Sequence, residues 1–143
     1  MGKIRHIIGN DFPKIVIPLI KGAKKSIKII VFDWRLYPEN PGASCQRFNQ
    51  AIISAHKRGV DVRAITNTRE TIKELKKINL KIKYLYSHNL VHIKLMIIDD
   101  EKIIVGSHNY SESAFERNLE LSVLLDNPEN KGRFIKFFNN LYG

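Results

Sequence analysis

The order of apolar and polar positions divides the chain into alternating strands and helices. Apolar runs rich in β-branched residues predict strands at 26–33, 60–66, 81–86, 92–98, 103–107 and 119–125. Apolar residues at helical spacing, with polar residues or proline at the starts, predict helices at 11–24, 43–57, 68–78, 111–116 and 128–142. The pattern therefore covers most of the chain with regular structure.

The succession of these elements indicates an α/β fold. A helix between the strands at 26–33 and 60–66 makes a β-α-β crossover, which places both strands parallel in one sheet. Later strands follow each other directly and favour antiparallel pairing, so we expect a mixed β-sheet flanked by helices on both faces. A chain of 143 residues without repeats or linkers predicts a single domain over 1–143.

Two of the predicted strands form a hairpin around the polar turn at 99–102. If its loop has an even number of residues, centred on the middle peptide bond, His92 falls opposite Asn109 and Lys94 opposite Ser107. Residues two apart on a strand share one face. These four polar side chains would then gather on one patch, with Cβ separations of about 4.5 to 5.5 Å across the strands.

The same segment carries a motif. It reads H-x-K-x4-D followed by G-S-x-N, with the specified residues at His92, Lys94, Asp99, Gly106, Ser107 and Asn109. This pattern resembles the signature of the phospholipase D superfamily, the HKD enzymes. Glu120 stands where the small single-motif bacterial nucleases of that superfamily carry a carboxylate that orients the catalytic histidine. The resemblance implies an α/β phospholipase D-like domain.

The resemblance also implies a mechanism. One histidine attacks phosphorus and a second protonates the leaving oxygen, and water then hydrolyses the phosphohistidine. Since this chain has one such motif but the mechanism uses two histidines, the resemblance implies a homodimer that brings together two copies of His92. Lys94, Ser107 and Asn109 would bind the non-bridging oxygens, and Glu120 would accept a hydrogen bond from His92. No cofactor and no metal ion are expected in this scheme.

Several nearby residues are left outside the predicted site. Asp99 and His108 have the opposite strand parity to the site residues. Asp99 is expected to brace the turn or to form an ion pair with Lys102 or another basic residue. The aromatic residues Trp34 and Tyr37 either stack on unpaired bases or lie in the core or the dimer interface. Tyr110, which follows the motif, either lines the groove or is likewise buried.

Composition adds a strong positive charge. Lys and Arg number 24 against 14 acidic residues, giving a formal charge of +10, so a polyanion is the expected partner. The basic residues cluster at Lys21, Lys24, Lys25 and Lys28, at Lys57 and Arg58, and at Lys73, Lys76, Lys77, Lys81 and Lys83. A merely soluble surface is the alternative, because a lysine-rich composition also follows from an AT-rich genome.

Cysteine content and hydropathy bear on the compartment. The single Cys45 excludes an intrachain disulfide and gives no structural zinc pattern. The amino-terminal apolar run is too short for a signal peptide, and no apolar stretch approaches the roughly 20 residues of a membrane-spanning helix. We therefore expect a soluble, cytoplasmic protein.

Three functions fit these observations. The leading hypothesis is a metal-independent, homodimeric phosphodiesterase that cleaves DNA or RNA with little sequence preference. The second is a phospholipase D-type enzyme that cuts an anionic lipid such as cardiolipin, although no strongly amphipathic basic helix points to a membrane surface. The third is a non-catalytic nucleic-acid-binding subunit, which would have no need of His92 or Glu120.

Overall fold

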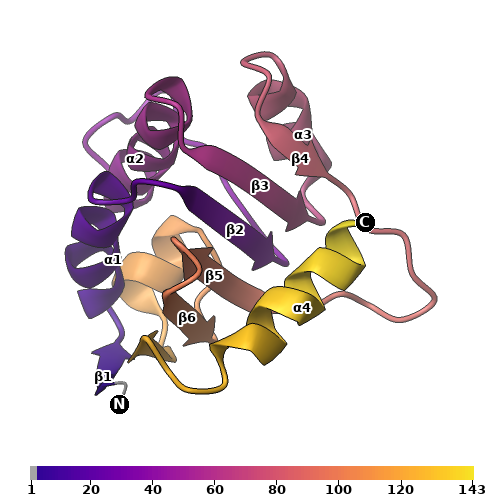
Figure 1. The fold of residues 1–143 in the computed structure, drawn as a ribbon. Coiled ribbons are helices and arrows are strands. Elements are labelled where there is room, and N and C mark those ends of the chain that lie inside the picture. Colours follow the sequence, from indigo (N-terminus) through magenta and orange to yellow (C-terminus); the bar gives the residue numbers. More distant parts are fainter. Residues whose placement is uncertain (1–2) are drawn as a thin grey trace.

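A seven-stranded sheet runs through the middle of the computed structural model, which describes residues 3–143 (Figure 1). The strands lie in the order β1-β7-β6-β5-β2-β3-β4. Their bounds are β1 Lys3–Ile8, β2 Ser26–Val31, β3 Asp61–Thr66, β4 Lys81–Lys83, β5 Lys94–Ile98, β6 Lys102–Gly106 and β7 Leu121–Asp126. The helices are α1 Asp11–Lys21, α2 Ser44–Lys57, α3 Arg69–Lys76 and α4 Lys131–Tyr142, with a π-helical turn, η1, at Ser113–Arg117.

The sheet is mixed, as the sequence predicted. α2 joins β2 to β3 and α3 joins β3 to β4, and both strand pairs are parallel. The remaining neighbours, including β2 and β5, are antiparallel. One edge of the sheet, here called the carboxyl edge, is therefore where β2 and β3 end at Val31 and Thr66 and β5 begins at Lys94.

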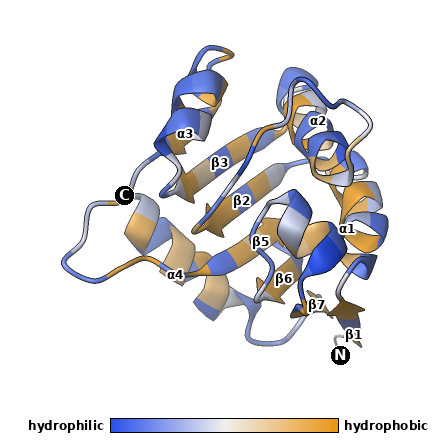
Figure 2. Cartoon of the chain, turned by 180° about the vertical axis from the view of Figure 1, so that it is seen from behind, coloured by the Kyte–Doolittle hydropathy of each residue, from blue (hydrophilic) through white to orange (hydrophobic). Residues whose placement is uncertain are grey.

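Helices cover both faces of the sheet, which confirms the predicted fold class. Phe12 of α1, Phe48 of α2 and Leu75 of α3 pack in one buried cluster, and Phe138 of α4 packs in a second cluster on the other face. Figure 1 shows α1 and α2 on one side of the strands and α4 on the other, and in Figure 2 the central strands are largely hydrophobic. None of the helices between residues 3 and 143 has the length and apolar character needed to cross a membrane.

The sequence prediction missed one strand and extended another too far, while most other boundaries shift by one to three residues. Residues 3–8 were not predicted as a strand, because Ile7 is the only buried residue of β1 and the pattern does not alternate. Pairing with β7, from Lys3 opposite Asp126 to Ile8 opposite Leu121, forms this strand instead. The strand predicted at 81–86 ends at Lys83, where the chain leaves the sheet.

The register of the β5–β6 hairpin corrects the predicted one by one residue. Leu95 pairs with Val105 and Ile98 with Lys102, so a three-residue loop is centred on Asp100 and Lys94 lies level with Gly106 rather than with Ser107. Asp99 and Asp100 both adopt left-handed backbone conformations, with φ of 54° and 52°. These two residues close the turn early, with the Glu101 amide donating to the Ile98 carbonyl.

Asp99 braces this turn, as expected from its strand parity. Its carboxylate accepts hydrogen bonds from the backbone amides of Lys24, Lys25 and Ser26 at the start of β2, the shortest being 2.7 Å from Lys25. Burial alone would raise the pKa of Asp99, but these amide bonds outweigh it and the pKa is lowered. The resulting stabilisation is present above the usual pKa of aspartate and is lost as the pH falls through the lowered value.

The aromatic residues singled out in the sequence belong to the core. Trp34 is 1% exposed and donates its indole N–H to Asn49, and Tyr110 is 2% exposed beside the Phe48 ring. Tyr37 is half-buried and its hydroxyl accepts a hydrogen bond from the Glu112 amide. Of the two alternatives, burial in the core is therefore confirmed for Trp34 and Tyr110, and neither can stack on a base.

We predict that Asp99→Asn lowers the free energy of unfolding by about 1 to 3 kcal/mol, because a neutral amide oxygen replaces a carboxylate bonded to amides. Urea unfolding at neutral pH measures this change. Asp100→Asn is the matched control. It removes the ion pair between Asp100, which is 47% exposed, and Lys28, which is 13% exposed, and should cost less than Asp99→Asn because one partner is lost rather than three amides. Equal stability of Asp99→Asn and wild type would contradict the bracing role.

Candidate functional site

The five predicted site residues come from three segments at the carboxyl edge. His92 and Lys94 stand at the start of β5, Ser107 and Asn109 follow the end of β6, and Glu120 precedes β7. β6 lies between β5 and β7, so the ends of all three strands are adjacent there. The site is thus assembled at the ends of neighbouring strands, whereas the sequence had suggested facing pairs across one hairpin.

His92 and Lys94 contact each other directly. The Lys94 ammonium donates to His92 Nδ1 at 2.8 Å and to the His92 carbonyl at 3.0 Å. The imidazole is exposed and packs with its centroid 4.9 Å from that of Phe32, the residue after β2. An imidazole and a positive charge therefore share an exposed surface.

Ser107 and Glu120 form a second contact in the site. The Ser107 hydroxyl donates to Glu120 at 2.5 Å and accepts from the Leu121 amide at 3.0 Å. Within residues 3–143 the Glu120 carboxylate bonds Ser107 and Asn118, and not His92 as the sequence had suggested. Glu120 thus holds the hydroxyl of Ser107 in this structure.

Gly106 lets this part of the site form. A Cβ on Gly106 would lie 2.3 Å from the Cα of Ser122, so the two strands approach too closely for any other residue. The glycine of the G-S-x-N motif is therefore required by the close packing of β6 against β7. It brings the Ser107 backbone to the Leu121 carbonyl, 3.0 Å away.

Asn109 is held by the segment that follows β2. Its side-chain oxygen accepts a hydrogen bond of 3.1 Å from the amide of Asp33, and the Asp33 carboxylate accepts one of 3.2 Å from the Thr68 hydroxyl. The amide oxygen of Asn109 is thereby occupied, which leaves its NH₂ group to donate to a ligand. This chain of bonds connects the site to the start of α3.

Lys94 is the site residue whose pKa is displaced. Burial lowers the pKa of its ammonium from the ordinary value, and the negative charge of Glu120 partly offsets this effect. The charge of Lys94 is therefore lost at a lower pH than that of an exposed lysine. Glu120 supports the positive charge without contacting the ammonium.

His108, which the sequence analysis left outside the site, is a structural residue. It is 1% exposed, its ring contacts the Ser122 hydroxyl at 2.7 Å and the Gly9 carbonyl at 2.9 Å, and it stacks on Phe12. Burial lowers its pKa, which keeps the imidazole neutral. It ties α1 and β7 to the segment that carries Ser107 and Asn109.

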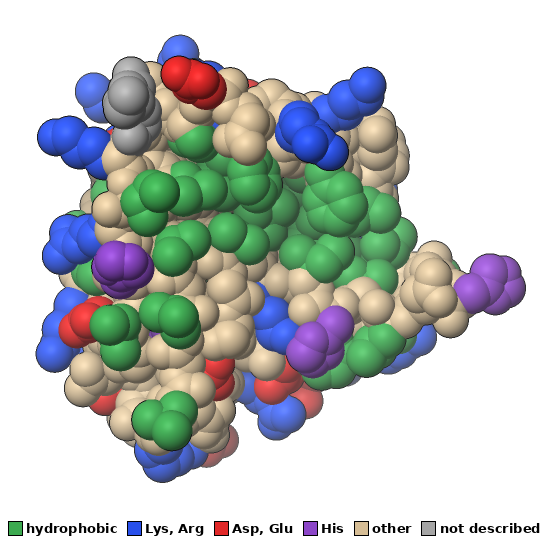
Figure 3. Space-filling model, turned by 90° about the horizontal axis from the view of Figure 1, so that it is seen from below, with side chains coloured by type: hydrophobic (Ala, Val, Ile, Leu, Met, Phe, Trp, Pro, Cys, Tyr) green, Lys and Arg blue, Asp and Glu red, His purple; other side chains and the backbone are tan. Residues whose placement is uncertain are grey.

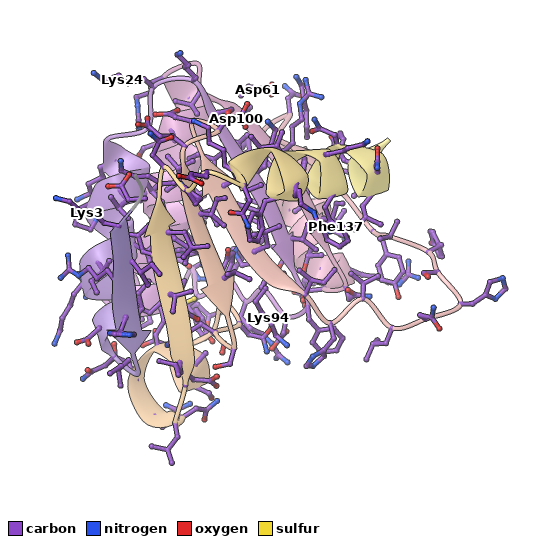
Figure 4. The ribbon with its side chains drawn as sticks, turned by 60° about the horizontal axis from the view of Figure 1, so that its bottom comes forward. Lys3, Lys24, Asp61, Lys94, Asp100 and Phe137 are labelled. Carbon is purple, nitrogen blue, oxygen red and sulfur yellow. The ribbon has the colours of Figure 1, made fainter. Side chains whose placement is uncertain are left out.

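The basic clusters are unevenly placed relative to the site. The cluster at 21–28 lies by the start of β2, at the edge opposite Lys94, and Figure 4 shows Lys24, Asp61 and Asp100 at the other end of the molecule from Lys94. Part of its charge is neutralised, since Lys28 pairs with Asp100. Lys81 is also engaged there by Asp61.

Sequence reasoning missed two residues of the site, Phe32 and Asp33. Phe32 lies against the His92 ring and Asp33 holds Asn109. Both follow a buried strand directly, at the edge of an α/β sheet where ligands bind. This position directly after a buried strand was the sequence signal that could have identified Phe32 and Asp33 as site residues.

A metal centre and an enclosed cavity are two other kinds of functional site that the described residues could form. Between residues 3 and 143 no group of three or more His, Cys, Asp and Glu side chains is arranged to hold a metal ion. A cavity of 600 Å³ between α2 and α3 contains none of the five predicted site residues. The site is an open surface at the sheet edge.

Comparison with known proteins gives a family match. A sequence model of the family described as cardiolipin synthase, PLD-like domain, matches residues 16–142. The mitochondrial cardiolipin hydrolase of Danio rerio is 28% identical over 131 residues, which cover 87% of this chain and 53% of that protein. The chain spans about half the length of the curated relatives it matches.

Solved structures share the fold over nearly the whole chain. The phospholipase D family member Nuc from Salmonella typhimurium has a TM-score of 0.82 at 22% identity, covering 99% of this chain and 95% of that one. NucT from Helicobacter pylori has a TM-score of 0.80 at 23% identity, covering 99% and 96%. At this identity the likeness concerns the fold.

We predict that the Lys94 ammonium titrates at a lower pH than the exposed lysines, and at a still lower pH in Glu120→Gln. The second shift follows because Glu120 raises the pKa of Lys94. NMR titration of isotope-labelled lysine side chains measures both values, with Lys94→Arg identifying the resonance. Glu129→Gln, which removes an exposed carboxylate elsewhere, is the control. Titration of Lys94 together with the other lysines would be incompatible with its burial.

Proposed function

Because the chain belongs to the PLD-like family, we propose that it is a phosphodiesterase whose nucleophile is His92. The observation that carries this proposal is the contact between the exposed His92 ring and the Lys94 ammonium, beside Ser107 and Asn109. An imidazole with an unprotonated nitrogen is a nucleophile at neutral pH, and the neighbouring cation draws a phosphodiester toward it.

The proposed reaction has two steps. A His92 nitrogen attacks phosphorus and forms a P–N bond, while a second imidazole donates its proton to the leaving oxygen as the P–O bond breaks. That second imidazole, now neutral, then takes a proton from water. The water oxygen attacks phosphorus, the P–N bond breaks, and the histidine nitrogen recovers its electron pair.

Lys94, Ser107 and Asn109 are proposed to stabilise the charge that builds on the non-bridging oxygens. Lys94 supplies a positive charge at a half-buried position, where electrostatic attraction is stronger than in bulk water. The NH₂ group of Asn109 supplies a directed donor. The single hydroxyl proton of Ser107 is donated to Glu120 in this structure, so Ser107 is proposed to turn from Glu120 to a phosphate oxygen when substrate binds. Glu120 acts as a positioning residue, since it holds Ser107 and sustains the charge of Lys94. This arrangement lets lysine perform the electrostatic task that a metal ion performs in other phosphodiesterases.

The second imidazole is proposed to come from a second copy of the chain. His108 is buried against Phe12 and cannot serve, so the site of one chain has a single exposed imidazole from its motif. The apolar surface beside the site supports such a homodimer. Leu121 is 57% exposed next to Glu120, and Phe137 of α4 is 46% exposed. Figure 3 shows hydrophobic side chains gathered on the face seen from below.

Nucleic acid is the proposed substrate, with little sequence preference. The net charge of +10 favours a polyanion, and Glu120 follows the pattern of the small single-motif nucleases. An anionic lipid is the second candidate, because the similar protein of Danio rerio is named a cardiolipin hydrolase. Incubation with labelled single-stranded and duplex DNA, RNA and cardiolipin vesicles separates these two functions. Binding without cleavage would indicate the non-catalytic subunit.

We predict that His92→Ala reduces cleavage by at least about a thousandfold while leaving the unfolding free energy nearly unchanged, because the side chain is exposed. Cleavage of the best substrate is followed in EDTA, with urea unfolding measured alongside. His88→Ala, at another exposed histidine, is the control. Substantial residual turnover in His92→Ala would refute the nucleophile, and loss of wild-type activity in EDTA would refute the metal-independent mechanism.

We also predict that only dimers with two copies of His92 are active. Wild type and His92→Ala are unfolded together in varied proportions and refolded. With a composite site, activity follows the square of the wild-type fraction, because mixed dimers contain one imidazole. Activity that is linear in that fraction would show that each chain acts alone.

A further inference from the structure

A groove between α3 and the segment after β4 combines cations with exposed aromatic rings. It has a volume of 460 Å³, and its polar and aromatic lining comprises Arg69, Lys73, Lys76, Lys83, Tyr84 and Tyr86. None of these residues belongs to the proposed catalytic site. Figure 1 shows the chain leaving the sheet after β4 and looping outward past the carboxyl end of α4.

The charges of α3 are segregated by face. Arg69, Lys73 and Lys76 line the groove at helical spacing, whereas Glu70 and Glu74 line the cavity on the other side of the helix. Among residues 3–143 no carboxylate lies within ion-pair distance of the three cations. The groove therefore holds positive charge without a direct ion pair, although Lys73 is close enough to Glu74 to help lower the pKa of that carboxylate.

The aromatic wall of the groove is ordered by Arg69. The Arg69 guanidinium carbon lies 4.2 Å from the centroid of the Tyr84 ring, and its Nη1 donates to the Tyr86 hydroxyl at 3.3 Å. The two tyrosine rings are 4.8 Å apart between centroids. Tyr86 is 74% exposed, so its ring offers a surface on which a planar group can stack.

This groove begins at the same edge of the sheet as the catalytic site. α3 begins directly after Thr68, whose hydroxyl bonds Asp33, and the Asp33 amide bonds Asn109 of the site. From there α3 runs back toward the opposite edge, so Arg69 lies nearest the site and Lys76 farthest from it. β4 is three strand positions from β5, or about 15 Å at the usual strand spacing. A few nucleotides of an extended strand cover this distance.

We propose that this groove binds an unpaired stretch of the nucleic acid whose phosphodiester lies at His92, with a base stacked on Tyr86 and phosphates along α3. The proposal rests on the function proposed above and specifies its substrate as single-stranded DNA or RNA. Exposed aromatics beside a line of cations suit single strands, whose bases are free to stack. The bases of a duplex are already stacked on each other, and a lipid headgroup has no ring for Tyr86.

The test compares two pairs of variants made in a His92→Ala background, which stops turnover. Binding of fluorescent oligothymidylate and oligouridylate is measured by anisotropy over a range of salt concentrations. Lys73→Gln/Lys76→Gln should weaken binding by about fivefold or more. It should also reduce the slope of log affinity against log salt concentration by about 1.4, the value for two phosphate contacts on a single strand. Lys24→Gln/Lys25→Gln removes the same charge at the opposite edge and should leave the slope unchanged.

The second pair tests the ring. Tyr86→Ala should weaken binding about fivefold or more, whereas Tyr86→Phe, which keeps the stacking surface, should bind within about twofold of its parent. Leu90→Ala, which removes another exposed apolar side chain of the same loop, should bind as its parent does. Because these side chains are exposed, unfolding curves should coincide for all variants.

A separate readout keeps the two proposals distinguishable. With His92 intact, turnover of bis(4-nitrophenyl) phosphate, which is too small to reach the groove, should be unaffected by changes at Lys73, Lys76 or Tyr86. No turnover of this compound or of any oligonucleotide would refute the proposed function, while oligonucleotide binding would still decide the groove. Equal oligonucleotide binding by all variants would overturn the groove proposal. The groove proposal would also be overturned if the variants lost binding to vesicles of phosphatidylcholine and cardiolipin but kept binding to oligonucleotides.

Discussion

The site depends on the register between β2 and β5, and the Asp99 carboxylate fixes that register from the far end of the sheet. By accepting hydrogen bonds from successive amides at the start of β2, it sets where β5 ends. The paired strands then carry the alignment across the sheet, so that Phe32 meets His92 at the carboxyl edge. A carboxylate that takes no part in the proposed chemistry thus determines which residues can meet there.

Local pattern was sufficient for most elements, and tertiary pairing decided those that were missed or misplaced. The buried strands, the crossover through α2 and the helices were predictable because their apolar spacing is regular. The strand at Lys3–Ile8 was not predictable, because its residues do not alternate between apolar and polar and the strand forms through backbone pairing with β7. The hairpin register failed for a related reason, since the left-handed conformations of Asp99 and Asp100 are favoured by contacts with a segment more than seventy residues away.

The residue types of the site were predictable, whereas their hydrogen-bond partners were not. His92 and Lys94 do meet, because their common strand parity puts them on one face. Glu120 bonds Ser107 because close packing at Gly106 brings the ends of β6 and β7 together. Net charge was a poor guide to location. Lysines at the opposite edge add to the overall field, whereas the cations of α3 lie where they can direct an extended ligand toward the site.

The strand at Lys3–Ile8 has one further consequence, because it leaves one row of backbone hydrogen-bonding groups unpaired at the rim of the sheet. Such a rim is a template on which other molecules can add strands and grow into aggregates. Lys3 and Arg5 are exposed on this strand, and a copy docked alongside would bring like charges into repulsion. The charges of Lys3 and Arg5 thus oppose self-association at a rim where Ile4 and Ile8 are also exposed.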